Sequence, residues 1–195
     1  MMIYIRAIKD KDAIAAVEFA FLAPILIFMI CGFMEYSHVS SARTRLEGAT
    51  MRAARAVAAS DCPSEREAIM LTIVTNGMDD IPSPNGGIVE VVTKSYSERF
   101  KDVGEPEPFN DLNGNKIWEA GEPFTDVNGN GSFDKDMGTT GSIGGAGQVV
   151  SYTARYKVLS LFTFVSRQFR NTDVYDIEAS TVIRNEPIFS TSGCT

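Results

Sequence analysis

The chain is 195 residues long, 44% of them hydrophobic and 22% charged, with a formal net charge of −7 at pH 7. A chain of this length holds one compact domain with room for an anchor. Phosphate backbones are bound by clustered lysines and arginines, which are in the minority here, so the composition argues against a nucleic-acid partner.

The first predicted element is an apolar helix. Residues 13–34 read AIAAVEFAFLAPILIFMICGFM, with a single charged residue. About 20 apolar helical residues span the core of a bilayer, so we assign residues 14–34 to a transmembrane helix. The run is longer than the ~7 to 15 residues of a cleavable signal core. Arg6, Lys9 and Lys11 precede it, which predicts a cytoplasmic N-terminus and export of the rest. Pro24 predicts a bend or a loosened turn.

Glu18 is the one charged residue of this run. A carboxylate in hydrocarbon costs several kcal/mol unless it is paired, protonated or close to an interface. One explanation is that Glu18 lies near the cytoplasmic end of the helix and reaches the lipid headgroups. The other explanation depends on the residues around it.

The segment AAVEFAFLAP, preceded by KDKD and followed by an apolar helix, resembles the type IV pilin-like N-terminus and most closely the TadE-like family of the tight adherence system. The resemblance implies a location in a bacterial inner membrane. It implies further that residues 1–13 are a charged cytoplasmic leader, and that a prepilin peptidase cuts between Ala13 and Ile14. It also implies that Glu18 is part of the processing and assembly signal. Ala13 stands where the family usually has Gly. In an assembled bundle Glu18 would pair with the freed amino group of a neighbouring subunit's Ile14.

Residues 35–60 continue the helix as an amphipathic stem, with apolar residues at intervals of three and four. These are Val39, Ala42, Leu46, Ala49, Ala53 and Val57. Small residues allow close approach of neighbouring helices or of a sheet; the simpler alternative is a helix packed on its own domain. His38, the only histidine, has no Cys or second His nearby, so we expect no metal or catalytic role for it.

Residues 61–195 are predicted to form the exported domain. A second helix follows Ser64, which would cap it together with Glu67, and ends near Gly77. Period-two alternation at 87–97, 148–158 and 173–185 predicts three long antiparallel strands. Residues 159–169 fit a strand extension, a buried loop or a short helix, and the Gly-rich residues 137–147 a flexible hinge.

The predicted fold class is therefore α+β, with a long N-terminal transmembrane helix that continues as a stem packed on a small antiparallel β-sheet. The hexapeptide VIRNEP at 182–187 also resembles the end of TadE-like domains.

The acidity of the chain comes from one stretch, because nine acidic residues against two lysines between 102 and 136 give it a net charge of −7. Within it, twelve-residue windows begin at Asp111 and Asp126, with oxygen-bearing residues at alternate positions as in an EF-hand calcium loop. The candidate Ca²⁺ ligands are Asp111, Asn113, Asn115, the carbonyl of Ile117, Glu119 and Glu122 in the first window, and Asp126, Asn128, Asn130, the carbonyl of Ser132, Asp134 and Asp136 in the second.

The two windows start fifteen residues apart, too close for flanking helices, and resemble the compact calcium loops of dockerin and thrombospondin type 3 repeats. Lys116 stands where Gly is usual, and the second window ends in Met137, so that Asp136 or Asp134 would have to replace the closing glutamate. A small shared core is expected from the aromatic residues Phe109, Trp118, Phe124 and Phe133. The alternative is a solvated, turn-rich loop without an ion; the tandem occurrence favours Ca²⁺ in a structural role.

Cys62 and Cys194 lie outside the apolar run, where an oxidising compartment permits pairing, and we predict a disulfide between them. Two reduced thiols, on a loop and in the tail, are the alternative.

The sequence contains no Ser/His/Asp or Cys/His constellation and no strand-anchored phosphate loop, so we expect no enzyme activity. The leading hypothesis is a minor pilin-like subunit of a tight-adherence, type IV-like pilus, with other pilin-like subunits and the assembly machinery as partners. The alternative is an uncleaved, signal-anchored periplasmic or surface binding module stabilised by Ca²⁺.

Overall fold

The computed structural model describes residues 11–60, 62, 65–84, 86–87 and 89–186, and for residues 11–13 only the backbone. Most of the predicted leader, residues 1–10, therefore lies outside the described residues. The same is true of Cys194 and of Ser64, the predicted cap of the second helix.

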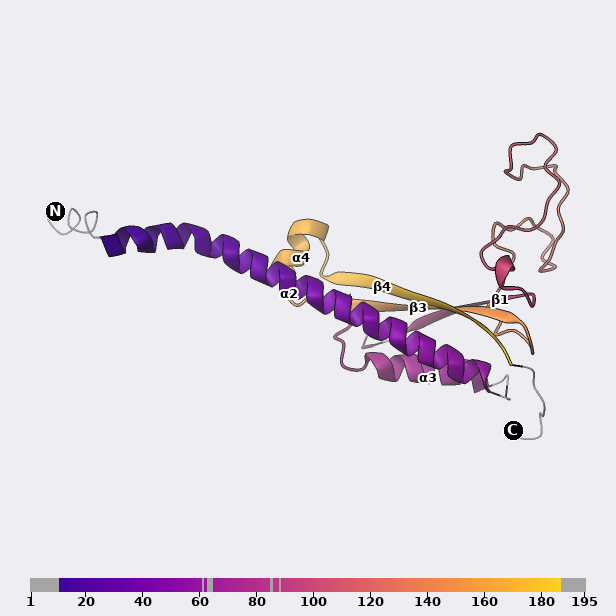
Figure 1. Ribbon diagram of the computed structural model, residues 1–195, viewed down its shortest axis with the longest axis horizontal. Helices are drawn as coiled ribbons and strands as arrows, with labels where there is room; N and C mark the ends of the chain where they lie inside the picture. Colours follow the sequence, from indigo (N-terminus) through magenta and orange to yellow (C-terminus); the bar gives the residue numbers. More distant parts are fainter. Residues whose placement is uncertain (1–10, 61, 63–64, 85, 88, 187–195) are drawn as a thin grey trace.

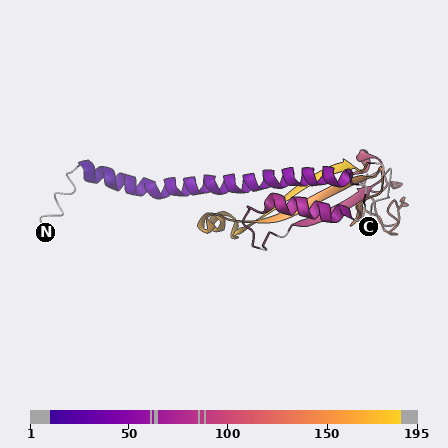
Figure 2. The ribbon, with the colours of Figure 1, turned by 90° about the horizontal axis from the view of Figure 1, so that it is seen from below.

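The first helix, α2 (Lys11–Ala58), runs without a break through the predicted transmembrane segment and the predicted stem. Pro24 lies inside it, and Figure 2 shows that its N-terminal half is curved while its C-terminal half is nearly straight. At 1.5 Å per residue the helix is roughly 70 Å long. Its N-terminal half extends well beyond the rest of the protein (Figure 1). Among the described residues this is the one helix long and apolar enough to cross a membrane.

The second helix, α3 (Arg66–Met78), lies beside the C-terminal half of α2. Its N-cap is Glu65, which makes no side-chain hydrogen bond to the first turn. The helix therefore begins within two residues of the predicted start. The two helices approach closely: a Cβ added at Gly77 would lie 2.6 Å from Cβ of Ala49. Glycine at this position therefore allows the helix contact.

A four-stranded antiparallel sheet completes the α+β fold, which the sequence predicted correctly. Its strand order is β2-β1-β3-β4. The strands are β1 (Glu90–Tyr96), β2 (Thr139–Thr140), β3 (Val149–Leu159) and β4 (Val174–Arg184). The register of the longest pair, β3 with β4, places Ala154 opposite Ala179. The short strand β2 lies in the segment predicted as a Gly-rich hinge, and a short 3-10 helix, η2 (Phe100–Asp102), follows β1.

The hydrophobic core lies between the two helices and one face of the sheet. The predicted stem positions from Ala42 to Val57 are fully buried there, and Val39 is partly buried. Their partners are Met70, Val74 and Met78 of α3 and inward-facing residues of β3 and β4, among them Val150, Tyr152, Ala154, Tyr156, Val158, Ile177 and Ala179. The opposite face is polar, where Arg155 pairs with Glu178 across the strands at 3.0 Å. The stem thus packs on its own domain.

The two ends of the sheet carry different structures (Figure 1). Residues 159–169, whose type the sequence left open, lead into and form most of a short helix, α4 (Thr163–Arg170), at the end facing the protruding half of α2. The acidic segment between η2 and β2 forms an extended loop at the other end.

Candidate functional site

The protruding half of α2 carries the residues predicted for processing and assembly. Ile14 and Glu18 are exposed, four residues apart on the same helix, so their side chains share one face. Ala13 lies in the helix, but its side chain is not described. The most apolar stretch of α2 has none of its residues buried by the domain, and most of its surface, apart from the side where Phe28 meets α4, is available to lipid or to other helices.

The first window of the acidic loop turns around Asp111. The carboxylate of Asp111 accepts hydrogen bonds from the N–H groups of Gly114 at 2.7 Å, Asn115 at 3.2 Å and Lys116 at 2.7 Å. The backbone turns sharply at Lys116, whose φ is +64°. The bonds from Lys116, Gly114 and Asn115 lower the pKa of Asp111. The first window therefore turns around the carboxylate of Asp111, with Lys116 in the left-handed conformation that glycine usually supplies.

A buried carboxylate closes this first window. The two oxygens of Glu122 accept from the N–H of Leu112 at 2.9 Å and from that of Glu119 at 3.0 Å. These donors are the second and ninth residues of the window, so Glu122 joins its two ends. Glu122 is the twelfth residue, as predicted.

The second window repeats the first. Asp126 accepts from the N–H groups of Gly129 at 2.6 Å, Asn130 at 3.2 Å and Gly131 at 2.7 Å. Gly131, with φ +78°, occupies the position of Lys116.

The closing carboxylate of the second window is Glu107, which the sequence analysis did not identify. Its two oxygens accept from the N–H of Val127 at 2.7 Å and from that of Asp134 at 3.1 Å. These are again the second and ninth residues, and Glu107 is fully buried. Its position in the second window therefore matches that of Glu122 in the first, although it precedes the window in the chain.

A repeated sequence explains why a glutamate that precedes the second window closes it. Glu-Pro-Phe occurs at 107–109 and again at 122–124, fifteen residues later, as do the two windows. The repeats pair symmetrically: Asn110 N–H donates to the carbonyl of Pro123 at 2.8 Å, and Thr125 N–H to that of Pro108 at 2.7 Å. Each repeat thus supplies the glutamate that closes the window of the other.

An aromatic cluster holds the two windows together, as predicted. Trp118 stacks on Phe133 with ring centroids 4.5 Å apart and an interplanar angle of 11°. Phe109 and Phe124 contact Phe133 edge to face at 5.7 and 5.8 Å, and they form an isolated β-bridge with each other.

Within each window the side chains predicted as Ca²⁺ ligands form hydrogen bonds with one another. The amide nitrogens of Asn113 and Asn115 each donate at 3.0 Å to Glu119, and those of Asn128 and Asn130 donate to Asp134. Within the described part of the chain, no three His, Cys, Asp or Glu side chains form a group that could hold a metal ion.

The backbone carbonyls proposed as ligands belong to Ile117 and Ser132, the seventh residue of each window. Their own N–H groups donate at 2.7 Å to the side-chain oxygens of Asn115 and Asn130. Both windows thus have the same local geometry at this position as well.

Asp136 lies beside the second window, where it lines a shallow hollow together with Asn128, Asn130 and Asp134. It accepts from the Lys94 ammonium, from the Tyr96 hydroxyl at 3.2 Å and from the N–H of Gly138 at 3.1 Å, so it joins the loop to the sheet. Burial opposes its ionisation, but Lys94, Gly138 and Tyr96 together lower its pKa. Burial and Asp136 raise the pKa of Tyr96 to about 12. Asp136 therefore anchors the loop to the sheet, while the N–H groups of Val127 and Asp134 donate to Glu107; the role of Asp136 as a ligand stays a prediction.

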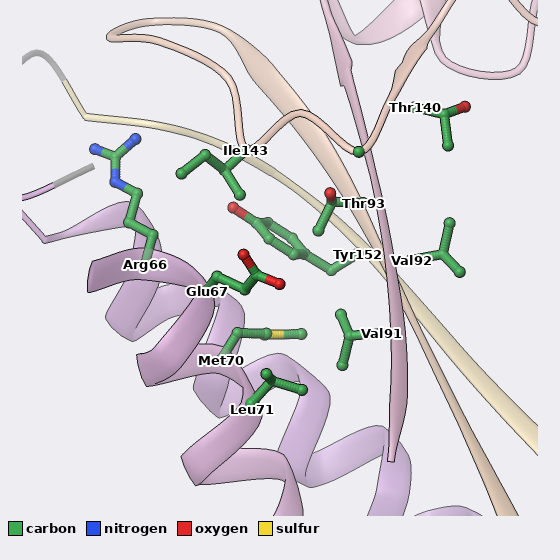
Figure 3. Close-up of a pocket in the computed structure, with 11 residues that line it drawn as sticks. Arg66, Glu67, Met70, Leu71, Val91, Val92, Thr93, Thr140, Ile143 and Tyr152 are labelled. Carbon is green, nitrogen blue, oxygen red and sulfur yellow. The ribbon is translucent and has the colours of Figure 1, made fainter. Parts of the chain in front are cut away.

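A separate cavity of about 290 Å³ lies between α3 and β1 (Figure 3). Arg66 is fully buried beside it and donates to the carbonyls of Ser60 and Gly144. The hydroxyl of Tyr152, directed toward the side lined by Ile143 and Arg66, is buried without a hydrogen-bond partner. Burial raises the pKa of Tyr152 to about 12. The other lining residues are mostly apolar, and they present no nucleophile paired with a base.

Two further residues that the sequence analysis singled out are His38 and Cys62. His38 Nε2 lies 3.2 Å from the carbonyl of Leu159 at the end of β3. Cys62 is described but Cys194 is not, so their disulfide stays a prediction.

Comparison with known proteins gives one match. No curated protein matches the chain, and no solved structure matches it. The model of a family described as TadE-like protein matches residues 13–55, which include the apolar run and most of the stem. This finding supports, for the N-terminal segment of the chain, the TadE-like resemblance inferred from AAVEFAFLAP.

Proposed function

We propose that the protein is a minor pilin-like structural subunit of a tight-adherence pilus, which assembles by packing of its N-terminal helix. The observation that carries the proposal is the exposed half of α2 with Glu18 on it, in a segment that matches the TadE-like family. Its partners are other pilin-like subunits, the pilus assembly machinery and a prepilin peptidase of the inner membrane. The function is structural rather than enzymatic.

Assembly uses the charge on α2. Cleavage between Ala13 and Ile14 creates an amino group one helical turn from Glu18. In a bundle, the amino group of one subunit neutralises Glu18 of the next, and both charges leave the hydrocarbon as a pair. An unpaired Glu18 in lipid costs several kcal/mol, so the pairing favours the assembled state over the isolated subunit.

The acidic loop is proposed to bind two Ca²⁺ ions in a structural role. Its donor set consists of carboxylate, amide and backbone oxygens, which Ca²⁺ prefers. Glu107 and Glu122 are buried carboxylates, and among the described residues neither forms an ion pair. Acidic side chains are rarely buried without a compensating partner, and a cation in each window would supply the missing positive charge. Extracellular calcium sites work at ~10⁻⁴ to 10⁻³ M.

The glutamates have matching roles in this proposal. Glu122 supplies the bidentate carboxylate to the first ion and Glu107 to the second, each fixed by two backbone N–H groups. The positive charge of the bound ions reduces the repulsion within a segment whose net charge is −7, and so allows both windows to be ordered. The predicted Cys62–Cys194 disulfide is a further stabilising link of the exported domain.

Two measurements on the native protein test the subunit assignment. N-terminal sequencing is expected to read Ile14 first. Glu18→Ala is expected to stay in the membrane fraction yet disappear from sheared pili, because the mature helix still inserts but has lost its pairing charge. Glu47→Ala is the matched control, since Glu47 is an exposed glutamate on the same helix that pairs only with Arg43. Normal assembly of Glu18→Ala would contradict the proposal.

The second candidate function is an uncleaved, signal-anchored surface or periplasmic binding module stabilised by Ca²⁺. Ala13 at the position where the family usually has Gly favours it. A native N-terminus at Met1 or Met2, together with absence from sheared pili, would establish this alternative.

A further inference from the structure

The short helix α4 exposes large apolar side chains next to the apolar half of α2. Phe164 is 53% exposed and Phe169 is 73% exposed, and Leu161 just before the helix is 47% exposed. Three such residues within nine positions form an apolar patch that the domain itself does not cover. We call Leu161, Phe164 and Phe169 the α4 patch.

The level of this patch along α2 is fixed by aromatic contacts. The ring of Phe28 lies 6.2 Å from that of Phe164 and 5.9 Å from that of Phe169, between centroids. Phe28 is six residues before Met34, where the apolar run ends, a distance of about 9 Å along the helix. The apolar faces of interfacial helices are buried ~5 to 10 Å into a bilayer. The two phenylalanines of the α4 patch therefore lie at the depth expected of such a helix, and Leu161, which lines a hollow with Met34 and His38, lies nearer the membrane surface.

The domain holds α4 in this position. Glu35, one residue beyond the apolar run and 4% exposed, accepts hydrogen bonds from the N–H groups of Leu161 at 3.0 Å and Phe162 at 2.9 Å. Its carboxylate thus lies at the N-terminus of α4, where the helix dipole favours negative charge. On the inner side of α4, Val165 and Ser166 are buried.

The charge of α4 also suits a lipid surface. Its sequence, TFVSRQFR, has two arginines and no acidic residue. Arg167 pairs with Asp173 and Arg170 lies over the ring of Tyr175 at 5.2 Å, so both are oriented while remaining exposed. The acidic loop lies at the opposite end of the sheet (Figure 1), away from this surface.

We propose that α4 is an interfacial membrane helix, resting on the leaflet at which α2 leaves the bilayer. The α4 patch inserts among the upper acyl chains, and Arg167 and Arg170 lie at the level of the lipid phosphates. The inference rests on the membrane anchoring of α2, because the patch is continuous with the exposed apolar surface of that segment. We therefore expect lipid to cover the α4 patch, and a second copy of the chain is the alternative that the test distinguishes.

The test is depth-dependent quenching of tryptophan fluorescence in the full-length protein. Phe164→Trp and Phe169→Trp are made in a Trp118→Phe background, which removes the one native tryptophan. The protein is reconstituted in phosphatidylcholine and phosphatidylglycerol vesicles whose acyl chains carry bromine. We expect both tryptophans to shift their emission to shorter wavelength and to lose most of their intensity.

Two controls make the outcome decisive. Phe33→Trp, 68% exposed within the apolar run, reports on α2, and Trp118 of the unaltered protein reports on the far end and is expected to keep its intensity. Quenching at 33 but not at 164 or 169 overturns the proposal. A blue shift at 164 without quenching also overturns it, because protein from a second copy then covers the patch. Absence of quenching at 33 refutes the anchor itself, and the proposal with it.

Discussion

The two windows of the acidic loop form the same structure twice, yet the chain closes them differently. The first is closed by Glu122, its own twelfth residue. The second is closed by Glu107, nineteen positions before its first residue Asp126. In both cases the carboxylate accepts the N–H groups of the second and ninth residues, so the geometry is equivalent although the connectivity is not.

The difference shows that the pair of repeats, and not the single window, is the structural unit. Each window needs a glutamate from a Glu-Pro-Phe segment, and those segments are held side by side by the Phe109 to Phe124 bridge and the aromatic cluster. A single repeat would leave one window without its closing residue. The Glu-Pro-Phe segments and the windows share the spacing of fifteen residues because each repeat contains one of each.

The largest effect is expected from calcium itself. If the two windows are equivalent, the full-length protein in detergent binds two ions, and saturating Ca²⁺ stabilises the domain relative to chelator by about 2.7 kcal/mol per site at a hundredfold excess over Kd. Isothermal titration gives the stoichiometry and thermal unfolding the stability. A single ion per chain would break the equivalence, and unchanged unfolding with millimolar Ca²⁺ would remove the calcium proposal.

The next effect separates the two windows. Glu107→Gln and Glu122→Gln each replace one N–H acceptor oxygen by an amide group and remove the charge offered to one ion. We expect each variant to bind one Ca²⁺ in the millimolar range and to lose about 1 to 3 kcal/mol of loop stability, the cost of an unsatisfied buried group. Glu105→Gln, two residues away and exposed, is the control and should bind two. Retention of both ions by Glu107→Gln would show that the second window has another closing residue.

Much of the fold could be predicted because its signals are local. Alternation located β1, β3 and β4 to within a few residues, and the spacing from Ala42 to Val57 marked the buried face of α2. The helix α4 could not be distinguished because much of its apolar surface is exposed beside Phe28 and is not buried in the core. The edge strand β2 has two residues, too few for any period.

In the acidic loop, too, local contacts could be predicted from the sequence and contacts between distant residues could not. Alternating oxygen-bearing residues located the start of both windows, since those hydrogen bonds join residues at most five positions apart. Glu107 could not be found by reading forward from Asp126, because it reaches the second window only through pairing of the two repeats. The repeated Glu-Pro-Phe was the available signal. Glu35 gave no such signal, since it acts across 126 residues of sequence on Leu161.

A smaller effect concerns the turn at the sixth residue of each window. Lys116 adopts φ +64° and Gly131 φ +78°; a left-handed backbone costs a residue with a side chain roughly 1 to 2 kcal/mol. Lys116→Gly in the Glu107→Gln background, where only the first window binds, should tighten Ca²⁺ binding by about fivefold to thirtyfold. Gly131→Ala in the Glu122→Gln background should weaken the second window. Equal affinities before and after Lys116→Gly would mean that the turn is unstrained.

The smallest effect is expected at Asp136, the residue that sequence spacing offered as the closing ligand of the second window. Its pair with Lys94 is partly exposed, and such pairs contribute ~0.2 to 1 kcal/mol. Asp136→Asn should therefore lower thermal stability slightly, because the loop is held less firmly to β1, while two Ca²⁺ ions still bind. If Asp136→Asn removed one ion and Glu107→Gln removed none, the closing carboxylate would come from the end of the window after all. The exchange between repeats would then have no part in ion binding, and the burial of Glu107 would serve only the packing of the loop.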